Sequence, residues 1–130
     1  MFKKLSIIKT SRVLKKFFKS EIYPEGYLAY ANRLPKEIQV NWFRDGGMII
    51  GKVTAGGKEF VTQGVDADDF ICMINESVFT VFNIPHDYFD VMRQTRTFKP
   101  PQREMELLED RSVSAQSFGS KRNDLLLQPA

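Results

Sequence analysis

Two glycine pairs divide the middle of this chain into three short segments, and they constrain the fold more than any other feature. Gly46-Gly47 and Gly56-Gly57 can adopt the positive φ angles that a tight hairpin turn requires. Ahead of the first pair, Ile38, Val40 and Trp42 occupy alternate positions, so they share one face of a half-buried strand. The sequence therefore predicts an antiparallel meander of three strands. We expect these strands over residues 37–44, 48–54 and 58–65.

A helix is predicted directly after the third strand. Asp66 can cap its first turn, where Asp68 and Asp69 add carboxylates that suit the positive end of the helix dipole. The helix should end near Asn83, because Pro85 disfavours helical geometry at the residue before it. The apolar residues of this segment fall within about 120° on a helical wheel, the width of a core-facing stripe. They are Phe70, Ile71, Ile74, Val78, Val81 and Phe82.

The order of these elements predicts an α+β fold of the β-β-β-α-β type. A three- to four-stranded antiparallel sheet packs against one main helix, and residues 96–99 supply a further edge strand. We also expect a short helix over residues 86–94 and a weaker acidic helix over residues 102–111. The open edge of such a sheet could pair with a second copy, so we expect the fold to allow a homodimer.

The charge of the chain is divided unevenly along its length. Residues 1–36 hold nine basic and two acidic residues, a net charge of +7. Residues 37–130 hold ten basic and fourteen acidic residues, a net charge of −4. The basic isoelectric point therefore belongs to a leader, in which residues 1–20 suggest an N-terminal basic amphipathic helix. This helix could pack on this or another chain, bind nucleic acid through phosphates, or lie on anionic lipid; it could also be a translation artefact.

We divide the chain into three parts on these grounds. They are a basic leader and linker over residues 1–36, an α/β domain over residues 37–101, and a weak helix with a flexible C-terminal tail over residues 102–130. The tail is either a frayed terminus or a segment that orders on a partner. In the second case its apolar residues would be the partner-binding anchors. These are Phe118, Leu125, Leu126 and Leu127.

The residue types needed for catalysis or metal binding are scarce. Cys72 is the only cysteine and His86 the only histidine, which excludes an intramolecular disulfide and argues against a cysteine or histidine metal site. Asp45 and Asp66 are better explained by a turn and a helix cap than as metal ligands. We read Cys72 as a buried or semi-buried thiol, because a nucleophile would need a base beside it. The sequence thus favours a protein that is not an enzyme and needs no cofactor or metal.

No apolar run reaches the roughly 18 residues that a membrane-spanning helix needs. Lysines interrupt the first 20 residues, so no apolar core of a signal peptide forms there. We therefore expect a cytoplasmic protein without a membrane span.

Residues 37–101 resemble the HicB family of antitoxins, which share a partial ribonuclease-H-like α/β module. The resemblance is carried by an ordered set of short matches. They are Val40-Asn41-Trp42-Phe43-Arg44-Asp45-Gly46, Ile49-Ile50-Gly51-Lys52-Val53, Glu59-Phe60-Val61-Thr62-Gln63-Gly64, Asp68-Asp69-Phe70, Asn75-Glu76 and Ile84-Pro85-His86-Asp87-Tyr88. This resemblance implies an antitoxin of a type II toxin–antitoxin system that neutralises a HicA-like, mRNA-cleaving toxin by covering its active surface.

Two functions follow as hypotheses. As an antitoxin, the acidic part of the chain would face a basic, RNA-binding surface of the toxin. Many HicB-like proteins add a C-terminal DNA-binding domain; only 29 residues follow Pro101 here, so we do not expect direct operator DNA binding. The alternative is a stand-alone nucleic-acid-binding module that uses the basic N-terminal helix together with exposed sheet aromatics such as Phe43.

Overall fold

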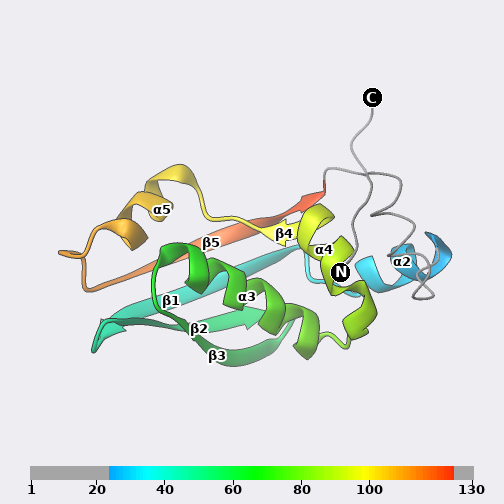
Figure 1. Cartoon of the computed structure of the whole chain (residues 1–130), viewed down its shortest axis with the longest axis horizontal. Helices are drawn as coiled ribbons and strands as arrows, with labels where there is room; N and C mark the ends of the chain where they lie inside the picture. The colour runs from blue at the N-terminus through cyan, green and yellow to red at the C-terminus, as the bar shows by residue number, and fades with distance from the viewer. Residues whose placement is uncertain (1–23, 125–130) are drawn as a thin grey trace, which may run out of the picture.

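Residues 24–124, the part that the computed structural model describes, form an α+β fold around a five-stranded antiparallel sheet (Figure 1). The strand order across the sheet is β3-β2-β1-β5-β4, which puts β1 at its centre. The strands are β1 (Glu37–Asp45), β2 (Met48–Ala55), β3 (Lys58–Gly64), β4 (Arg96–Phe98) and β5 (Ala115–Asp124). The helices are α2 (Pro24–Ala31), α3 (Ala67–Val81), α4 (Phe89–Thr95) and α5 (Gln102–Glu109), with a 3-10 turn, η1 (His86–Tyr88).

The predicted meander is present, and its glycine pairs form the turns. Gly46 and Gly47 have φ angles of 60° and 85°, and Gly56 and Gly57 have φ angles of 54° and 79°. Two consecutive positive φ angles define the type I′ turn, whose twist matches that of the strands it joins. Each turn therefore fixes the register of its hairpin.

Helix α3 begins and ends close to where the sequence places it. The Asp66 carboxylate accepts a hydrogen bond from the Asp69 amide at 2.8 Å, and the Asp69 carboxylate accepts one from the Val65 amide at 2.8 Å. The first bond satisfies an amide that the first helical turn leaves without a partner, and the second ties the residue before the cap to the same turn. At the other end, Asn83 takes a φ angle of 62°.

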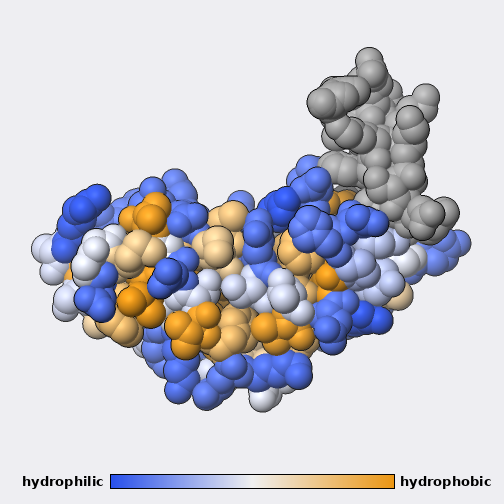
Figure 2. All heavy atoms as spheres, turned by 60° about the horizontal axis from the view of Figure 1, so that its bottom comes forward, coloured by the Kyte–Doolittle hydropathy of each residue, from blue (hydrophilic) through white to orange (hydrophobic). Residues whose placement is uncertain are grey.

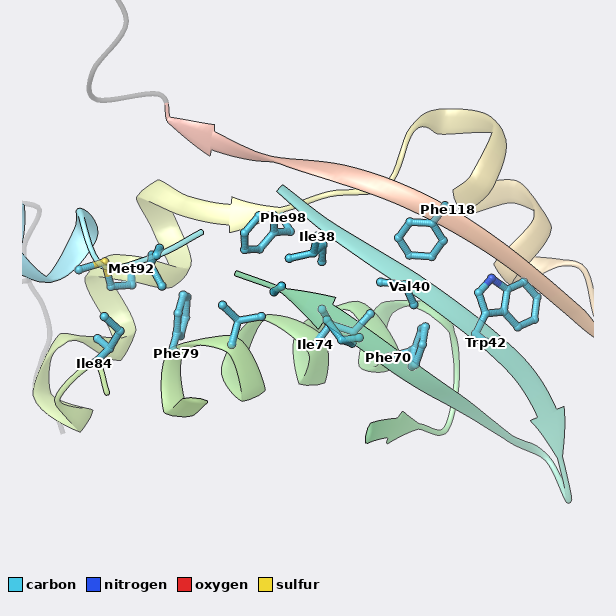
Figure 3. Close-up of a cluster of buried hydrophobic side chains, with 14 of the residues drawn as sticks. Ile38, Val40, Trp42, Phe70, Ile74, Phe79, Ile84, Met92, Phe98 and Phe118 are labelled. Carbon is cyan, nitrogen blue, oxygen red and sulfur yellow. The ribbon is translucent and has the colours of Figure 1, made fainter. Parts of the chain in front are cut away.

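The core lies between α3 and one face of the sheet (Figure 3). Phe70, Ile74 and Val78 of the predicted stripe are buried there, opposite Val40 and its neighbours on β1. Phe79, which falls outside that stripe, is also fully buried. Its ring packs edge-on against the Phe89 ring of α4, with 5.4 Å between the ring centroids. The buried surface of α3 is therefore wider than predicted, because α4 also packs against it.

The C-terminal part of the sheet corrects two predictions. The sheet has five strands rather than three or four, and residues 115–124 are strand β5 rather than part of a flexible tail. Strand β5 lies between β1 and β4, and its Phe118 pairs with Val40. Its sequence is mostly polar, so the two neighbouring strands rather than local propensity decide its structure. The predicted boundary between residues 101 and 102 therefore separates β5 from the other strands of the same sheet.

The segment before β1 also differs from the prediction, because Pro24–Ala31 forms helix α2 rather than part of a linker. The Tyr27 hydroxyl donates to Thr95 Oγ1 at 2.6 Å, and Arg122 Nη1 donates to the Ala31 carbonyl at 2.7 Å. Pro24 supplies the fixed φ angle suited to a first helical turn. These bonds join α2 to α4 and β5, and make it part of the same fold.

Some predictions concern residues outside the described part of the chain. They are the basic helix over residues 1–20 and the anchors Leu125, Leu126 and Leu127. Within residues 24–124, no helix has the length and apolar character needed to cross a bilayer.

Candidate functional site

The face of the sheet opposite α3 is lined by exposed and half-buried side chains, and we call it the open face. Along β1, burial alternates strictly from Glu37 to Trp42, so every second residue of this strand points away from the core. The open-face residues that follow from this alternation are Gln39, Asn41 and Phe43 of β1, Ile50, Lys52 and Thr54 of β2, Glu59, Val61 and Gln63 of β3, and Ala115 and Ser117 of β5. A partner can therefore reach a broad, twisted surface.

Four apolar side chains form what we call the Phe43 cluster: Phe43, Ile50, Val61 and Ala115. Phe43 is 48% exposed and stands directly opposite both Ile50 and Ala115 in the register. Val61 is 68% exposed and lies diagonally from Ile50, within reach across the strands. These residues line a shallow hollow on the sheet together with Asn41, Lys52 and Ser117. Exposed apolar groups gathered in this way are typical of a surface that binds another molecule.

Arg44, the residue after Phe43, holds one side of this cluster in place. Its side chain donates hydrogen bonds to the carbonyls of Val113 (2.7 Å), Leu108 and Asp110 (3.1 Å). Its amide donates to the Ser114 carbonyl at 2.8 Å. These bonds fix the turn that leads from α5 into β5, so Ala115 enters the sheet beside Phe43.

Acidic side chains flank the same end of the sheet. Asp66, Asp68 and Glu109 line a hollow between the start of α3 and the end of α5, and Arg44 and Arg111 line the same hollow. Nearby, the hydroxyl and amide of Ser112 both donate to Asp110, at 2.7 and 2.9 Å. These hydrogen bonds lower the pKa of the Asp110 carboxyl below its ordinary value, so this group stays charged in mildly acidic solution.

The structure also locates the candidate nucleophile. Cys72 lies on the outer side of α3 and is exposed, so our reading of it as a buried or semi-buried thiol is wrong. Desolvation of the sulfur by the protein atoms around it and the neighbouring Glu76 carboxylate, 3.8 Å away, raise the pKa of the thiol although the residue as a whole is exposed. A raised pKa reduces the fraction of reactive thiolate. Residues 24–124 contain no group of three or more histidine, cysteine or acidic side chains placed to hold a metal ion.

The rate of Cys72 alkylation tests this electrostatic setting. We expect Glu76→Gln to speed the reaction with iodoacetamide severalfold at pH 8, because the variant removes a negative charge that disfavours the thiolate. Mass spectrometry of the folded chain follows the reaction. The control is Asp87→Asn, which removes an exposed carboxylate that is not among the causes of the Cys72 shift. Equal rates for wild type and Glu76→Gln would show that Glu76 does not affect the thiol.

The structure does not support Phe118 as a partner-binding residue, and the other three predicted anchors lie outside the part that it describes. Phe118 is 5% exposed and packs in the core from β5, so it is a structural residue and not an accessible anchor. Leu125, Leu126 and Leu127 lie outside the described residues. The structure instead draws attention to the Phe43 cluster. The sequence pattern that indicates this cluster is the alternation along β1, which puts Phe43 on the face opposite Ile38, Val40 and Trp42.

Comparisons with protein-family models, curated proteins and solved structures found no match to this chain.

Proposed function

We propose that this chain is an antitoxin-like binding protein that neutralises a HicA-like, mRNA-cleaving toxin by covering its active surface. The observation that supports this proposal best is the Phe43 cluster on the open face of the sheet. Aromatic side chains that are solvent-exposed on a rigid scaffold are typical anchors of protein interfaces. The toxin would bury Phe43 and Val61, which are 48% and 68% exposed in the free chain.

The net negative charge of residues 24–124 also supports a partner with a basic surface. Residues 24–124 contain twelve basic and fifteen acidic side chains, a net charge of −3. A ribonuclease that binds the RNA backbone needs a basic surface, since phosphate contacts supply most of the affinity. The acidic part of the chain, residues 24–124, would be attracted to such a surface and compete with RNA for it.

The open face also carries polar groups suited to the rim of an interface. Lys52 and Glu59 form an exposed ion pair at 3.6 Å, and Asn41 and Ser117 lie on either side of the β1–β5 pairing. Polar side chains around an apolar centre match the usual anatomy of a protein interface. Inhibition by this route is steric: the sheet occupies the surface that RNA would otherwise contact.

The substitution Phe43→Lys tests the proposal. We expect this variant to bind the toxin at least about 30-fold more weakly than wild type, because it removes an anchor and adds a positive charge facing a basic surface. We expect the toxin to be a small basic protein encoded by the adjoining gene, and this protein is the binding partner in the test. Affinity is measured by calorimetry with the full-length chain, and inhibition by cleavage of a labelled RNA.

Leu28→Lys is the matched control, because Leu28 is 45% exposed but lies on α2, away from the open face. It makes the same change of charge and should leave binding and inhibition at wild-type levels. The proposal fails if the product of the adjoining gene neither cleaves RNA nor binds the chain. The assignment to the open face fails if Phe43→Lys inhibits as well as wild type does.

A further inference from the structure

Strand β3 forms one edge of the sheet, and within residues 24–124 no other strand pairs with its outer side. Its seven residues contain no proline, and Lys58 is its only lysine. Natural proteins usually protect a long edge strand with prolines, lysines, bulges or a covering segment, because a free edge readily pairs with another strand. The β3 edge lacks most of these protections and therefore suits a further strand.

The hairpin geometry determines which backbone groups this edge offers. In a two-residue type I′ hairpin, the residues that flank the turn form a hydrogen-bonded pair. Here they are Ala55 and Lys58. Since hydrogen-bonded and non-bonded positions alternate along an antiparallel pair, Glu59, Val61 and Gln63 point their amides and carbonyls away from β2. These groups are available to a strand that docks on the edge.

An apolar groove runs beside the same edge, between β3 and α3. Its apolar lining residues are Phe60, Val61, Met73, Val81 and Phe89, and Glu76, Ser77 and Thr80 complete the lining. A hydrogen bond of 3.3 Å from the Ser77 hydroxyl to Thr62 Oγ1 holds the helix against the strand. Figure 2, which brings the β3 side of the molecule forward, shows apolar patches between hydrophilic ones. Pairing at the edge would therefore bury apolar side chains as well as satisfy backbone groups.

We propose that a second copy of this chain occupies the edge, with the two β3 strands paired antiparallel about Val61. In this register Val61 faces its own counterpart, Glu59 faces Gln63 of the second copy, and Lys58 faces Gly64. No like charges oppose each other, and the three outward-facing residues meet as hydrogen-bonded pairs. The strand is thus complementary to itself.

Other registers of the two β3 strands would pair fewer residues or bring like charges together. Centring the pair on Phe60 or Thr62 leaves two residues at one end of each strand unpaired. Centring it on Glu59 sets two carboxylates directly against each other, which is destabilising. Side chains that face each other across a strand pair lie on the same side of the sheet, so the Val61-centred dimer keeps both open faces on one side. The two Phe43 clusters then form one longer apolar surface, whatever partner this surface binds.

The substitution Val61→Glu separates dimerisation from folding. Within one chain, position 61 stands opposite Lys52, so an added carboxylate has a partner of opposite charge. Across the dimer the two introduced carboxylates face each other. We expect the variant to dimerise at least about tenfold more weakly than wild type in sedimentation velocity runs of the full chain. Its thermal melt should show a cooperative transition.

Val61→Lys should also weaken the dimer, because two lysines then face each other across it. This lysine also faces Lys52 within its own chain, so a thermal melt checks that the variant folds. An equimolar mixture of the two variants should dimerise again through opposite charges at the seam. Asn41→Glu is the matched control: position 41 also faces Lys52, but from the interior strand β1, so its dimerisation should equal that of wild type. A wild-type chain that stays monomeric at the highest concentration reached overturns the proposal. So does a dimer that Val61→Glu leaves intact, or a mixture that does not re-form one.

Discussion

Replacing Asn75 with aspartate is expected to destabilise the fold by about 4 kcal/mol, although the two side chains have nearly the same shape. Asn75 is 4% exposed and lies on α3. Its Oδ1 accepts a hydrogen bond from the Phe98 amide at 2.6 Å, and its Nδ2 donates to the Phe98 carbonyl at 3.0 Å. Nδ2 also donates to the Ile71 carbonyl at 2.9 Å. One amide side chain therefore satisfies both backbone groups of Phe98, as a neighbouring strand would.

The aspartate variant keeps the acceptor but loses both donor bonds. It also places a carboxylate oxygen against the carbonyls of Phe98 and Ile71, in a site that water does not reach. An unpaired buried charge costs about 3–5 kcal/mol. The core strand pairs β1–β2 and β1–β5 do not involve Asn75, so we expect the β4 region to loosen first.

Urea unfolding followed by circular dichroism measures this loss. Asn41→Asp is the matched control, because Asn41 is exposed on the open face; there the same exchange should change stability by less than about 0.5 kcal/mol. If Asn75→Asp were as harmless as the control, the two bonds to Phe98 would contribute nothing to the stability of the fold.

The part of the fold that sequence could predict is the part specified by local signals. The two glycine pairs and the alternation of Ile38, Val40 and Trp42 predict β1, β2 and β3 nearly to the residue. Asp66 and the apolar stripe predict α3 in the same way. Each of these signals acts within a few residues, so the chain context hardly alters it.

The missed parts depend on contacts between distant segments. Strand β5 is mostly polar, and only its place between β1 and β4 makes it a strand. Phe118 therefore looked like a free anchor although it pairs with Val40 in the core. The role of Asn75 could not be predicted either, because an asparagine amide can bond many partners. The backbone groups of Phe98 that it bonds lie 23 residues away in the sequence.

Parts of the candidate site can be predicted from the sequence, but their assembly into one cluster cannot. The alternation of β1 already puts Phe43 on the face away from the core, and the open edge of the meander was expected from the order of the strands. Sequence could not show that Ala115 arrives beside Phe43, because this depends on the bonds that Arg44 makes to the carbonyls before β5. The Phe43 cluster is thus assembled from strands that only the folded sheet brings together.

Phe70→Ala is the second substitution for which we expect a loss of about 4 kcal/mol. Phe70 (labelled in Figure 3) is fully buried on α3, and its ring fills the space that Gly51 of β2 leaves free. A Cβ atom at position 51 would lie 2.4 Å from Phe70 Cζ and 2.8 Å from Cε1. Truncating the ring leaves a cavity between helix and sheet, while the Asp66 cap remains intact. Urea unfolding of the full chain measures the loss.

A double-mutant cycle shows whether the ring and the glycine are fitted to each other. Gly51→Ala alone should cost about 1–3 kcal/mol, and much less when Phe70→Leu has removed the ring atoms that it would strike. Gly64→Ala is the control, because a Cβ atom there would lie 2.4 Å from the Phe70 backbone nitrogen and 2.5 Å from its Cα, which no change of side chain relieves. Its cost should therefore be the same in both backgrounds. If Phe70→Leu left the cost of Gly51→Ala unchanged, the close approach of α3 to β2 would not depend on the pairing of this ring with this glycine.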